Sequence, residues 1–238
     1  MSSIYSKNYW YESAKVFKDT KMLVFGALIV ALRVAVKLLK IPLMAGLSLT
    51  FDAYVNSLGS MVYGPLMGLL VGAVSDTLGC VIAPTGPYFL PFVLVEMSSS
   101  FIFALFFWKR DLTVFRVLSA KFTVNFICNI VLTSLFMKWS YYVFYGVEKA
   151  EGYALINATR IVKNLVIFPF ESVIIIIVLG AISKMLYDMK LIPRRHDLTF
   201  KKKHYIVIAL LFVLSVSLIL FYIFFLKDFI SAHNIKLF

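Results

Sequence analysis

Charge is scarce in this 238-residue sequence, and negative charge is the scarcest part of it. Only 15% of the residues are charged and 12 are acidic, whereas 61% are hydrophobic. Soluble domains contain about 25% charged and about 45–50% apolar residues. The composition therefore excludes an ordinary soluble globular protein, and lipid is the expected solvent for much of the chain.

Cysteine, histidine and the common catalytic motifs are few or missing. Cys80 and Cys128 lie in apolar segments at a spacing that matches no zinc or redox motif, so we expect reduced, buried side chains. The histidines, His196, His204 and His233, lie outside the central apolar segments. The sequence has no phosphate-binding loop, zinc-protease motif or nucleophile elbow. We therefore expect no cofactor, no bound metal and no enzymatic activity.

Positive charge is more frequent and gives a formal net charge of +12. The basic residues lie mostly between apolar segments and form no separate polar domain, so we expect no nucleic-acid partner. Lys and Arg are enriched in the cytoplasmic loops of membrane proteins. A cytoplasmic N-terminus places more than half of them on that side, and this orientation is our prediction.

Seven apolar segments approach the roughly 20 residues that a helix needs to cross a bilayer. Between the second and third, Tyr63-Gly64-Pro65 predicts a short re-entry, because proline removes a backbone donor and glycine permits a tight turn. Gly64, Gly68 and Gly72 form a stripe that favours close helix packing. The segments are 22–39, 48–63, 65–83, 89–107, 115–137, 158–187 and 205–226.

These segments predict an all-α integral membrane protein. We divide it into a cytoplasmic N-terminal segment (1–21), a six-helix membrane domain (22–188), a basic cytoplasmic linker (189–204) and an extra C-terminal transmembrane helix with its tail (205–238). The first span does not resemble a signal peptide, because it follows a polar stretch and contains Arg33 and Lys37.

The sixth span carries a polar face. Arg160, Lys163, Asn164 and Glu171 lie within about 100° of one another around the helix. Polar groups inside a membrane are costly and usually mark function, which favours an anion site whose donors bind carboxylates. Alternatively, Arg160 and Lys163 anchor the outer end of the helix by reaching the interface.

The fifth span carries a second stripe. Lys121, Asn125, Asn129 and Thr133 follow one another at intervals of four residues. Amides here either bind a heterocycle or hold helices together. In the predicted orientation, Lys121 lies near the cytoplasmic end, where it can also contact headgroups.

The first span has two unlike faces. Ala27, Ala31 and Ala35 share one stripe, which lets another helix approach closely, whereas Arg33 and Lys37 lie roughly opposite and are predicted to face inward. The alanines can also be ordinary helix formers.

Three carboxylates in the apolar segments need partners. Asp76 either accepts hydrogen bonds from a ligand or holds the following loop, and the same two roles are possible for Glu96. Glu96 and Glu171 can also pair with Arg160 or Lys163. Aromatic residues after the fifth span favour an interfacial belt, and some can stack on a flat ligand: Trp139, Tyr141, Tyr142 and Tyr145.

Over about residues 20–188 the chain resembles the S components of energy-coupling factor (ECF) vitamin importers, and among them the folate family. The first match is Ala27-Leu-Ile-Val-Ala31. Two further motifs are shared across several S components and identify the superfamily: the stretch from Tyr63-Gly64-Pro65 to Asp76-Thr-Leu-Gly79, and Pro84-Thr-Gly86-Pro87-Tyr88-Phe89. Two look specific to the folate branch: Lys121-Phe-Thr-Val-Asn125-Phe-Ile-Cys-Asn129 and Arg160-Ile-Val-Lys163-Asn164-Leu-Val-Ile-Phe-Pro169.

The resemblance implies a bacterial, multi-pass cell-membrane protein: a six-helix bundle that binds one vitamin from outside with high affinity. It implies a transmembrane coupling protein and two cytoplasmic ATPases as partners, and the alanine face as the docking surface for the coupling protein. Folate has a flat pterin ring and a tail with two carboxylates. Arg160, Lys163 and Arg33 would neutralise the tail, Asn125, Asn129 and Asn164 would read the ring or the amide link, and Asp76 is a further candidate.

Two alternatives remain at this point. One keeps the architecture and changes the cargo to another water-soluble vitamin or pterin. The other is a proton-coupled carrier that uses Asp76, Glu96 or Glu171 as its proton site. Such a carrier would transport without ATPases, whereas an S component would not.

Overall fold

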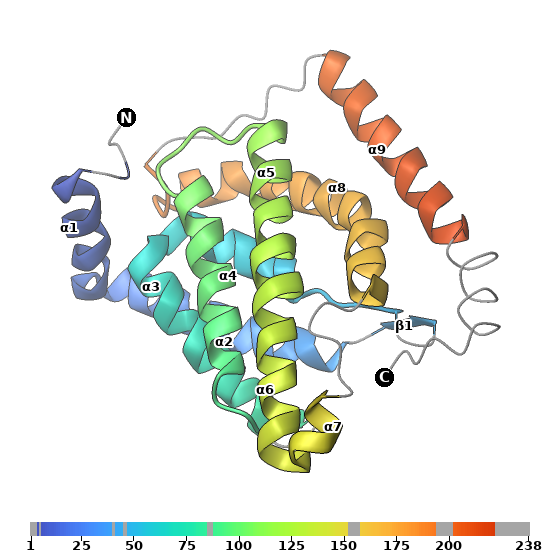
Figure 1. The fold of residues 1–238 in the computed structure, drawn as a ribbon. Coiled ribbons are helices and arrows are strands. Elements are labelled where there is room, and N and C mark those ends of the chain that lie inside the picture. The colour runs from blue at the N-terminus through green and yellow to red at the C-terminus, as the bar shows by residue number, and fades with distance from the viewer. Residues whose placement is uncertain are drawn as a thin grey trace.

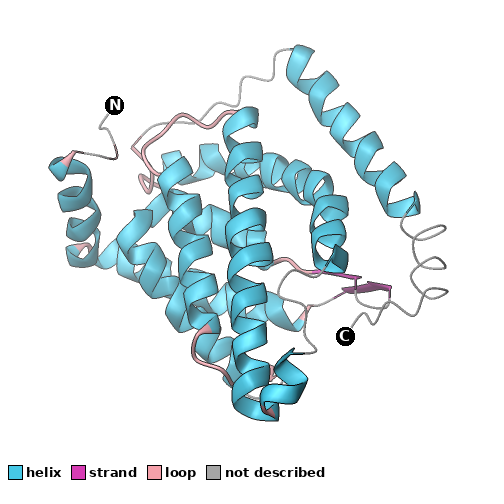
Figure 2. Cartoon of the chain, in the orientation of Figure 1, coloured by secondary structure: helices cyan, strands magenta, loops and turns pink. Residues whose placement is uncertain are grey.

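The structure, a computed structural model, describes residues 4, 6–39, 41–44, 47–84, 88–151, 158–193 and 202–221. Helices form nearly all of it (Figures 1 and 2). In chain order they are α1 (Lys7–Lys15), the short turn η1 (Val16–Lys18), α2 (Thr20–Leu38), α3 (Asp52–Ile82), α4 (Phe92–Phe107), α5 (Val114–Val124), the π-helical η2 (Asn125–Leu132), α6 (Thr133–Tyr145), α7 (Val147–Glu151), α8 (Ala158–Asp188) and α9 (Lys202–Phe221).

A short antiparallel hairpin lies between α2 and α3 (Figure 2). Its strands are β1 (Ile41–Met44) and β2 (Leu47–Leu49), and they pair in the register Ile41↔Leu49, Pro42↔Ser48 and Met44↔Leu47. The sequence predicted helices throughout and did not predict this hairpin. The predicted motif Thr85-Gly86-Pro87, the linker residues 194–201 and the tail 222–238 lie outside the described residues.

Three helical segments in the described part of the chain are long and apolar enough to cross a membrane. They are Asp52–Ile82, Val114–Tyr145 and Arg160–Asp188, and α4 is a shorter apolar helix. The predicted helical membrane fold is thus confirmed in its general class. α2 has only 19 residues, so every 18-residue stretch of it contains all three of its basic residues, Lys21, Arg33 and Lys37. The count of six crossing helices, and a crossing by α9, stay predictions.

The second and third predicted spans form a single bent element, α3. Its bend lies at Gly64, which has φ 80° and ψ −176°. Glycine adopts a positive φ without the penalty that a Cβ brings, and Pro65 begins the next helical turn, where its missing N–H costs little. The predicted break between the two spans thus lies at a kink that joins two helices, and no connecting loop separates them.

Two glycines of α3 bring α4 close. A Cβ added at Gly68 would lie 3.4 Å from the Ser100 carbonyl oxygen, and one at Gly72 would lie 2.9 Å from the Glu96 carbonyl oxygen. This agrees with the predicted packing role of the glycine stripe. The close approach places Glu96 and Ser100 of α4 directly beside α3.

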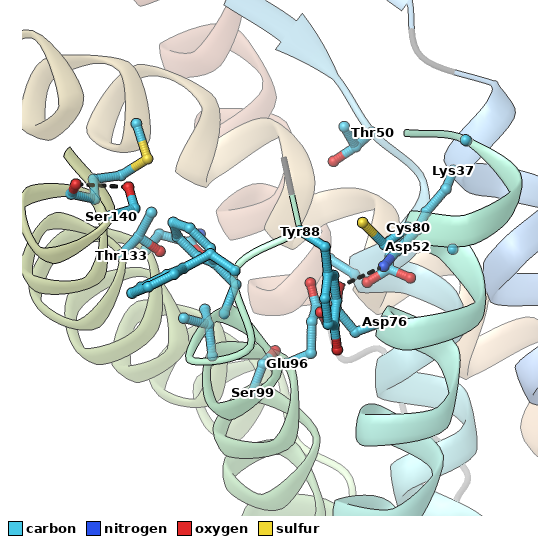
Figure 3. A pocket seen from close by; sticks show the side chains of 18 of the residues that line it. Lys37, Thr50, Asp52, Asp76, Cys80, Tyr88, Glu96, Ser99, Thr133 and Ser140 are labelled. Atoms are coloured by element: carbon cyan, nitrogen blue, oxygen red, sulfur yellow. Dashed lines mark hydrogen bonds and ion pairs between the residues drawn. The ribbon is translucent and has the colours of Figure 1, made fainter. Parts of the chain in front are cut away.

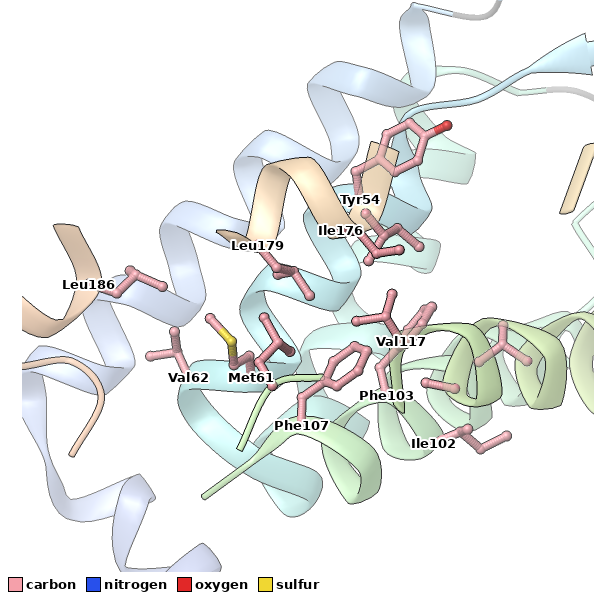
Figure 4. Packing of buried hydrophobic residues seen from close by; sticks show 14 of the residues in the cluster. Tyr54, Met61, Val62, Ile102, Phe103, Phe107, Val117, Ile176, Leu179 and Leu186 are labelled. Atoms are coloured by element: carbon pink, nitrogen blue, oxygen red, sulfur yellow. The ribbon is translucent and has the colours of Figure 1, made fainter. Parts of the chain in front are cut away.

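The hydrophobic core lies where α3, α4, α5 and α8 meet (Figure 4). Met61, Phe103, Val117 and Leu179 are among its buried side chains, one from each of these helices. α9 contacts α8 and stands at the edge of the bundle (Figure 1). The core therefore fixes how α3, α4, α5 and α8 are placed, and these four helices also surround the main cavity.

Candidate functional site

A cavity of about 720 Å³ lies beside this core, between α3, α4, the α5–η2–α6 segment and α8 (Figure 3). One part of its wall is aromatic and comes from the start of α4 and from α6: Tyr88, Phe89, Phe92, Tyr141, Phe144 and Tyr145. The other part is charged: Lys37, Asp52, Asp76, Glu96, Lys121 and Glu171. Small-molecule sites typically have about 300–1,000 Å³ and a few polar groups in an apolar wall. The cavity therefore has the size and lining of a ligand site.

Arg33 is fully buried and bonds two of the residues that line the cavity, Asp52 and Glu96. Its Nε and Nη2 donate to the two carboxylate oxygens of Asp52 at 2.9 and 2.8 Å, and Nη1 donates to Ser100 Oγ at 3.2 Å. Nη2 also pairs with Glu96. Arg33 faces inward, as its position in the sequence predicted. Its fork holds two carboxylates in place and ties α2 to α3 and α4, and it is not one of the cavity-lining residues.

Two further ion pairs form the charged wall. Lys37 Nζ lies 3.0 Å from Asp76 Oδ1, and Lys121 Nζ lies 2.7 Å from Glu171 Oε2. Lys121 is only 2% exposed, so its predicted alternative of contacting headgroups is wrong. The suggested pairing of Glu96 and Glu171 with Arg160 or Lys163 is also corrected, because these carboxylates pair with Arg33 and Lys121.

Three asparagines join η2 to α8. Asn129 Nδ2 donates to Asn125 Oδ1 at 3.1 Å and to Asn164 Oδ1 at 3.2 Å. Asn125 Nδ2 donates to the Asn164 carbonyl oxygen at 3.4 Å, and Asn164 Nδ2 donates to the Arg160 carbonyl oxygen at 2.9 Å. The sequence left open whether these amides bind a ligand or hold helices together. All three contribute to holding the helices, and Asn129 also lines the cavity.

Asn129, which lines the cavity, lies within the π-helical segment η2. A π-helix has wider turns than an α-helix and often occurs at functional sites. Thr133, at the start of α6, donates from Oγ1 to the Cys128 carbonyl oxygen at 2.8 Å and also lines the cavity. The regular spacing of four residues predicted an ordinary helix here, so the π-helical turn could not be read from the sequence.

The remaining predicted residues lie outside the cavity lining. Arg160 donates from Nη1 to Ser134 Oγ at 3.3 Å, next in the chain to the lining residue Thr133. Lys163 lies on the same helix face and is half-buried. The predicted docking residues of α2 are all exposed, on the face opposite Arg33: Ala27, Ala31 and Ala35.

The aromatic wall is built by edge contacts. Phe89 packs against Trp139 and Phe92 with ring centroids 5.4 and 5.8 Å apart. The Tyr88 hydroxyl lies 3.4 Å from Thr77 Oγ1. The sequence favoured an interfacial belt for Trp139 and its neighbours, which stays a prediction, and two of these neighbours, Tyr141 and Tyr145, line the cavity. Flat faces of this kind can stack on a planar ligand.

One cavity residue that the sequence reading missed is Asp52. It is a lone carboxylate just before an apolar run, which is the same signal that drew attention to Glu96. Among the described residues, no group of three or more His, Cys, Asp or Glu side chains is arranged to hold a metal ion. The charged side chains of the cavity wall are held by ion pairs with one another and with Arg33.

Residues 17–188 match the family described as ECF-type riboflavin transporter, S component. The folate transporter FolT of Leuconostoc mesenteroides is 30% identical over 154 residues, which cover 64% of this chain and 81% of that protein. The FolT of Clostridium novyi is 29% identical over 119 residues, which cover 50% of this chain and 64%, less than two thirds, of that protein. A crystal structure of FolT bound with folic acid superposes with a TM-score of 0.54 at 26% identity, covering 65% of this chain and 89% of that one.

Proposed function

Because the chain belongs to the S components of ECF-type transporters, and among them to the folate family, we propose that it captures folate from outside the cell with high affinity and passes it inward. The cavity carries this proposal. Every residue that lines it lies between Lys37 and Glu171, inside the stretch that matches the family. An aromatic wall facing a charged wall suits a molecule with a flat ring and a polar tail.

The proposed membrane arrangement has six crossing helices. They are α2, the two halves of α3 on either side of Gly64, α4, the α5–η2–α6 segment and α8. The N-terminus lies in the cytoplasm, in agreement with the distribution of basic residues. The protein is then a multi-pass component of the cell membrane, and α9 is an additional segment outside the region that matches the family.

The proposed partners are a transmembrane coupling protein and two cytoplasmic ATPases. The exposed alanine face of α2 is the surface that we propose for the coupling protein. Ala27, Ala31 and Ala35 leave a shallow stripe where another helix can approach closely. Leu28 and Leu32 beside the stripe are 61% and 42% exposed, which adds apolar area to the same face.

We propose distinct roles for the residues of the site. Asp76 and Asn129 contact the ligand, whereas Asn125 and Asn164 hold the Asn129 amide. Arg33 acts through Asp52 and Glu96, whose positions it fixes. Arg160 and Lys163 receive the carboxylates of the folate tail, near Ser134, to which Arg160 donates.

The test is a titration of the purified protein in detergent with folic acid, followed by the fluorescence of its three tryptophans and by calorimetry. We expect tight one-to-one binding without ATP or sodium. Arg160→Ala and Lys163→Ala should each weaken binding about tenfold or more, as the loss of a charge-assisted hydrogen bond does. Lys7→Ala, which removes an exposed lysine of α1, is the matched control. Absence of binding to folic acid and its reduced forms, with binding of riboflavin, would reassign the cargo.

A further inference from the structure

The direction of each amide in the asparagine cluster is determined by its neighbours. Asn164 Nδ2 donates to the Arg160 carbonyl oxygen, so Asn164 turns its Oδ1 toward Asn129. Asn125 Nδ2 donates to the Asn164 carbonyl oxygen, so Asn125 also turns its Oδ1 toward Asn129. An amide flip at Asn129 would set its oxygen against two oxygens. Both hydrogens of Asn129 Nδ2 are therefore used within the protein.

The oxygen of the same amide is left for the cavity. Asn129 is half-buried and lines the cavity, and within the described parts of the chain no side chain or backbone N–H donates to its Oδ1. The neighbouring Thr133 uses its hydroxyl hydrogen on the Cys128 carbonyl and likewise presents lone pairs. This part of the wall accepts hydrogen bonds and has little to donate.

The charged wall likewise favours hydrogen-bond donors of a ligand over its acceptors. Its carboxylates are Asp52, Asp76, Glu96 and Glu171, and in the described structure they pair with three cations, Arg33, Lys37 and Lys121. One negative charge remains after this pairing. A ligand carboxylate is therefore disfavoured next to this wall, and a ligand N–H is favoured there.

We infer that Asn129 is a specificity-determining residue that selects a heteroaromatic ring carrying an N–H donor, by accepting a hydrogen bond at Oδ1. The inference rests on the proposed binding of folate in this cavity. In folate, the ring donor that we assign to this bond is the 2-amino group, whereas the tail offers carboxylates. The ring edge therefore enters toward Asn129, and the tail lies away from the carboxylates.

The experiment compares two ligands on the wild-type protein by calorimetry. They are folic acid and its 2-desamino-2-methyl analogue, which lacks the 2-amino donor. We expect the analogue to bind about tenfold more weakly, the effect of one lost hydrogen bond to a partly buried acceptor. Tight binding of folic acid together with equal binding of the analogue would overturn the inference and leave the proposed function intact. Failure to bind folic acid at all would overturn both.

Two variants separate the accepting oxygen from the rest of the side chain. Asn129→Gln keeps an amide oxygen together with both amide hydrogens, and we expect it to keep the preference for folic acid. Asn129→Leu removes the oxygen, and the two ligands should then bind equally, with folic acid weakened about tenfold. Equal loss of the preference in both variants would show a purely structural role. Asn8→Leu, on the exposed face of α1, is the control, and the wild-type comparison decides even if Asn129→Leu does not fold.

Discussion

The protein contains two long helical segments that depart from regular helix geometry, and they depart in different ways. α3 bends sharply at Gly64, and a backbone N–H just after this bend is hydrogen-bonded within the protein. The Leu66 N–H donates to Ser13 Oγ of α1 at 3.1 Å, and the Trp108 ring lies over Gly64. The α5–η2–α6 segment widens into a π-helix, and two of its polar residues, Asn129 and Thr133, line a cavity.

The difference shows how an irregular helix can serve either architecture or recognition. At Gly64 the freed donor is buried under α1, whose Tyr9 is 1% exposed and packs edge-on against Trp108 at 4.8 Å. At Asn129 the amide hydrogens are used by the protein and the oxygen is left toward the cavity. Changes at the bend should therefore lower stability, and changes at the π-helix should lower affinity.

The largest effect is expected from Gly64→Ala, which should lower the stability of the bend in α3. The φ of 80° is unfavourable for any residue with a Cβ, and the new Cβ would lie 2.7 Å from the Trp108 ring. We expect a loss of about 2–4 kcal/mol in the free energy of unfolding, measured by denaturation in detergent. The fraction that stays folded should bind folic acid normally. Gly68→Ala is the control, and equal stability of the two variants would contradict the role of the bend.

The second largest effect is expected at the π-helical region, where a change should lower the affinity for folic acid. Asn164→Leu removes the acceptor and donor that orient Asn129, so folic acid should bind about tenfold more weakly. Its unfolding should change less than that of Gly64→Ala. Calorimetry and denaturation on the same preparation measure both quantities. Unchanged affinity would show that the asparagine cluster only holds η2 against α8.

A smaller effect is expected from Ser13→Ala at the bend. The Ser13 side chain is fully buried and accepts the hydrogen bond from Leu66, so its removal leaves a donor unsatisfied. The cost should be about 1 kcal/mol in stability, without change in the dissociation constant for folic acid. A change in affinity instead would link α1 to the binding site and weaken the separation of the two regions.

The smallest effect is a dependence of stability on pH at α1. A hydrogen bond from Lys109 holds the pKa of the Glu12 carboxyl below its usual value of 4.5. The folded state therefore favours the carboxylate. Its contribution is present at neutral pH and is lost as the pH falls below this value. Glu12→Gln should lower stability at pH 7 by less than about 1 kcal/mol, because the pair is near the surface.

The measurement compares thermal unfolding of wild type and Glu12→Gln at pH 7 and at pH 4. The difference between the two proteins should shrink at the lower pH. A constant difference would mean that the Glu12–Lys109 pair makes no titrating contribution.

The helices could be predicted because their signals are local. The sixth span was placed at 158–187 and is observed at Ala158–Asp188, since a long apolar run needs only its own composition to be recognised. The place of the bend was marked by Tyr63-Gly64-Pro65, although its form was not. The inward position of Arg33 followed from the two unlike faces of α2, on which the alanines are exposed.

The ion pairs of the site could not be predicted in the same way. Glu96 and Glu171 were each left with several possible partners, because the sequence does not say which helix faces which. Arg33 and Glu96 are 63 positions apart, and they meet only because glycines let α4 approach α3 beside α2. The Lys121–Glu171 pair likewise depends on the packing of α5 against α8.

The sequence by itself thus indicated that lipid surrounds much of the chain. It also indicated the helices, the family motifs and the residue types available for a binding site. Each of these depends on composition or on neighbours within a turn or two of helix. Only the tertiary structure decided that Arg33, Lys37 and Lys121 are already paired with carboxylates and that Asn129 turns its oxygen to the cavity. Those outcomes depend on hydrogen-bond directions and close contacts between helices, and such contacts exist only once the bundle has packed.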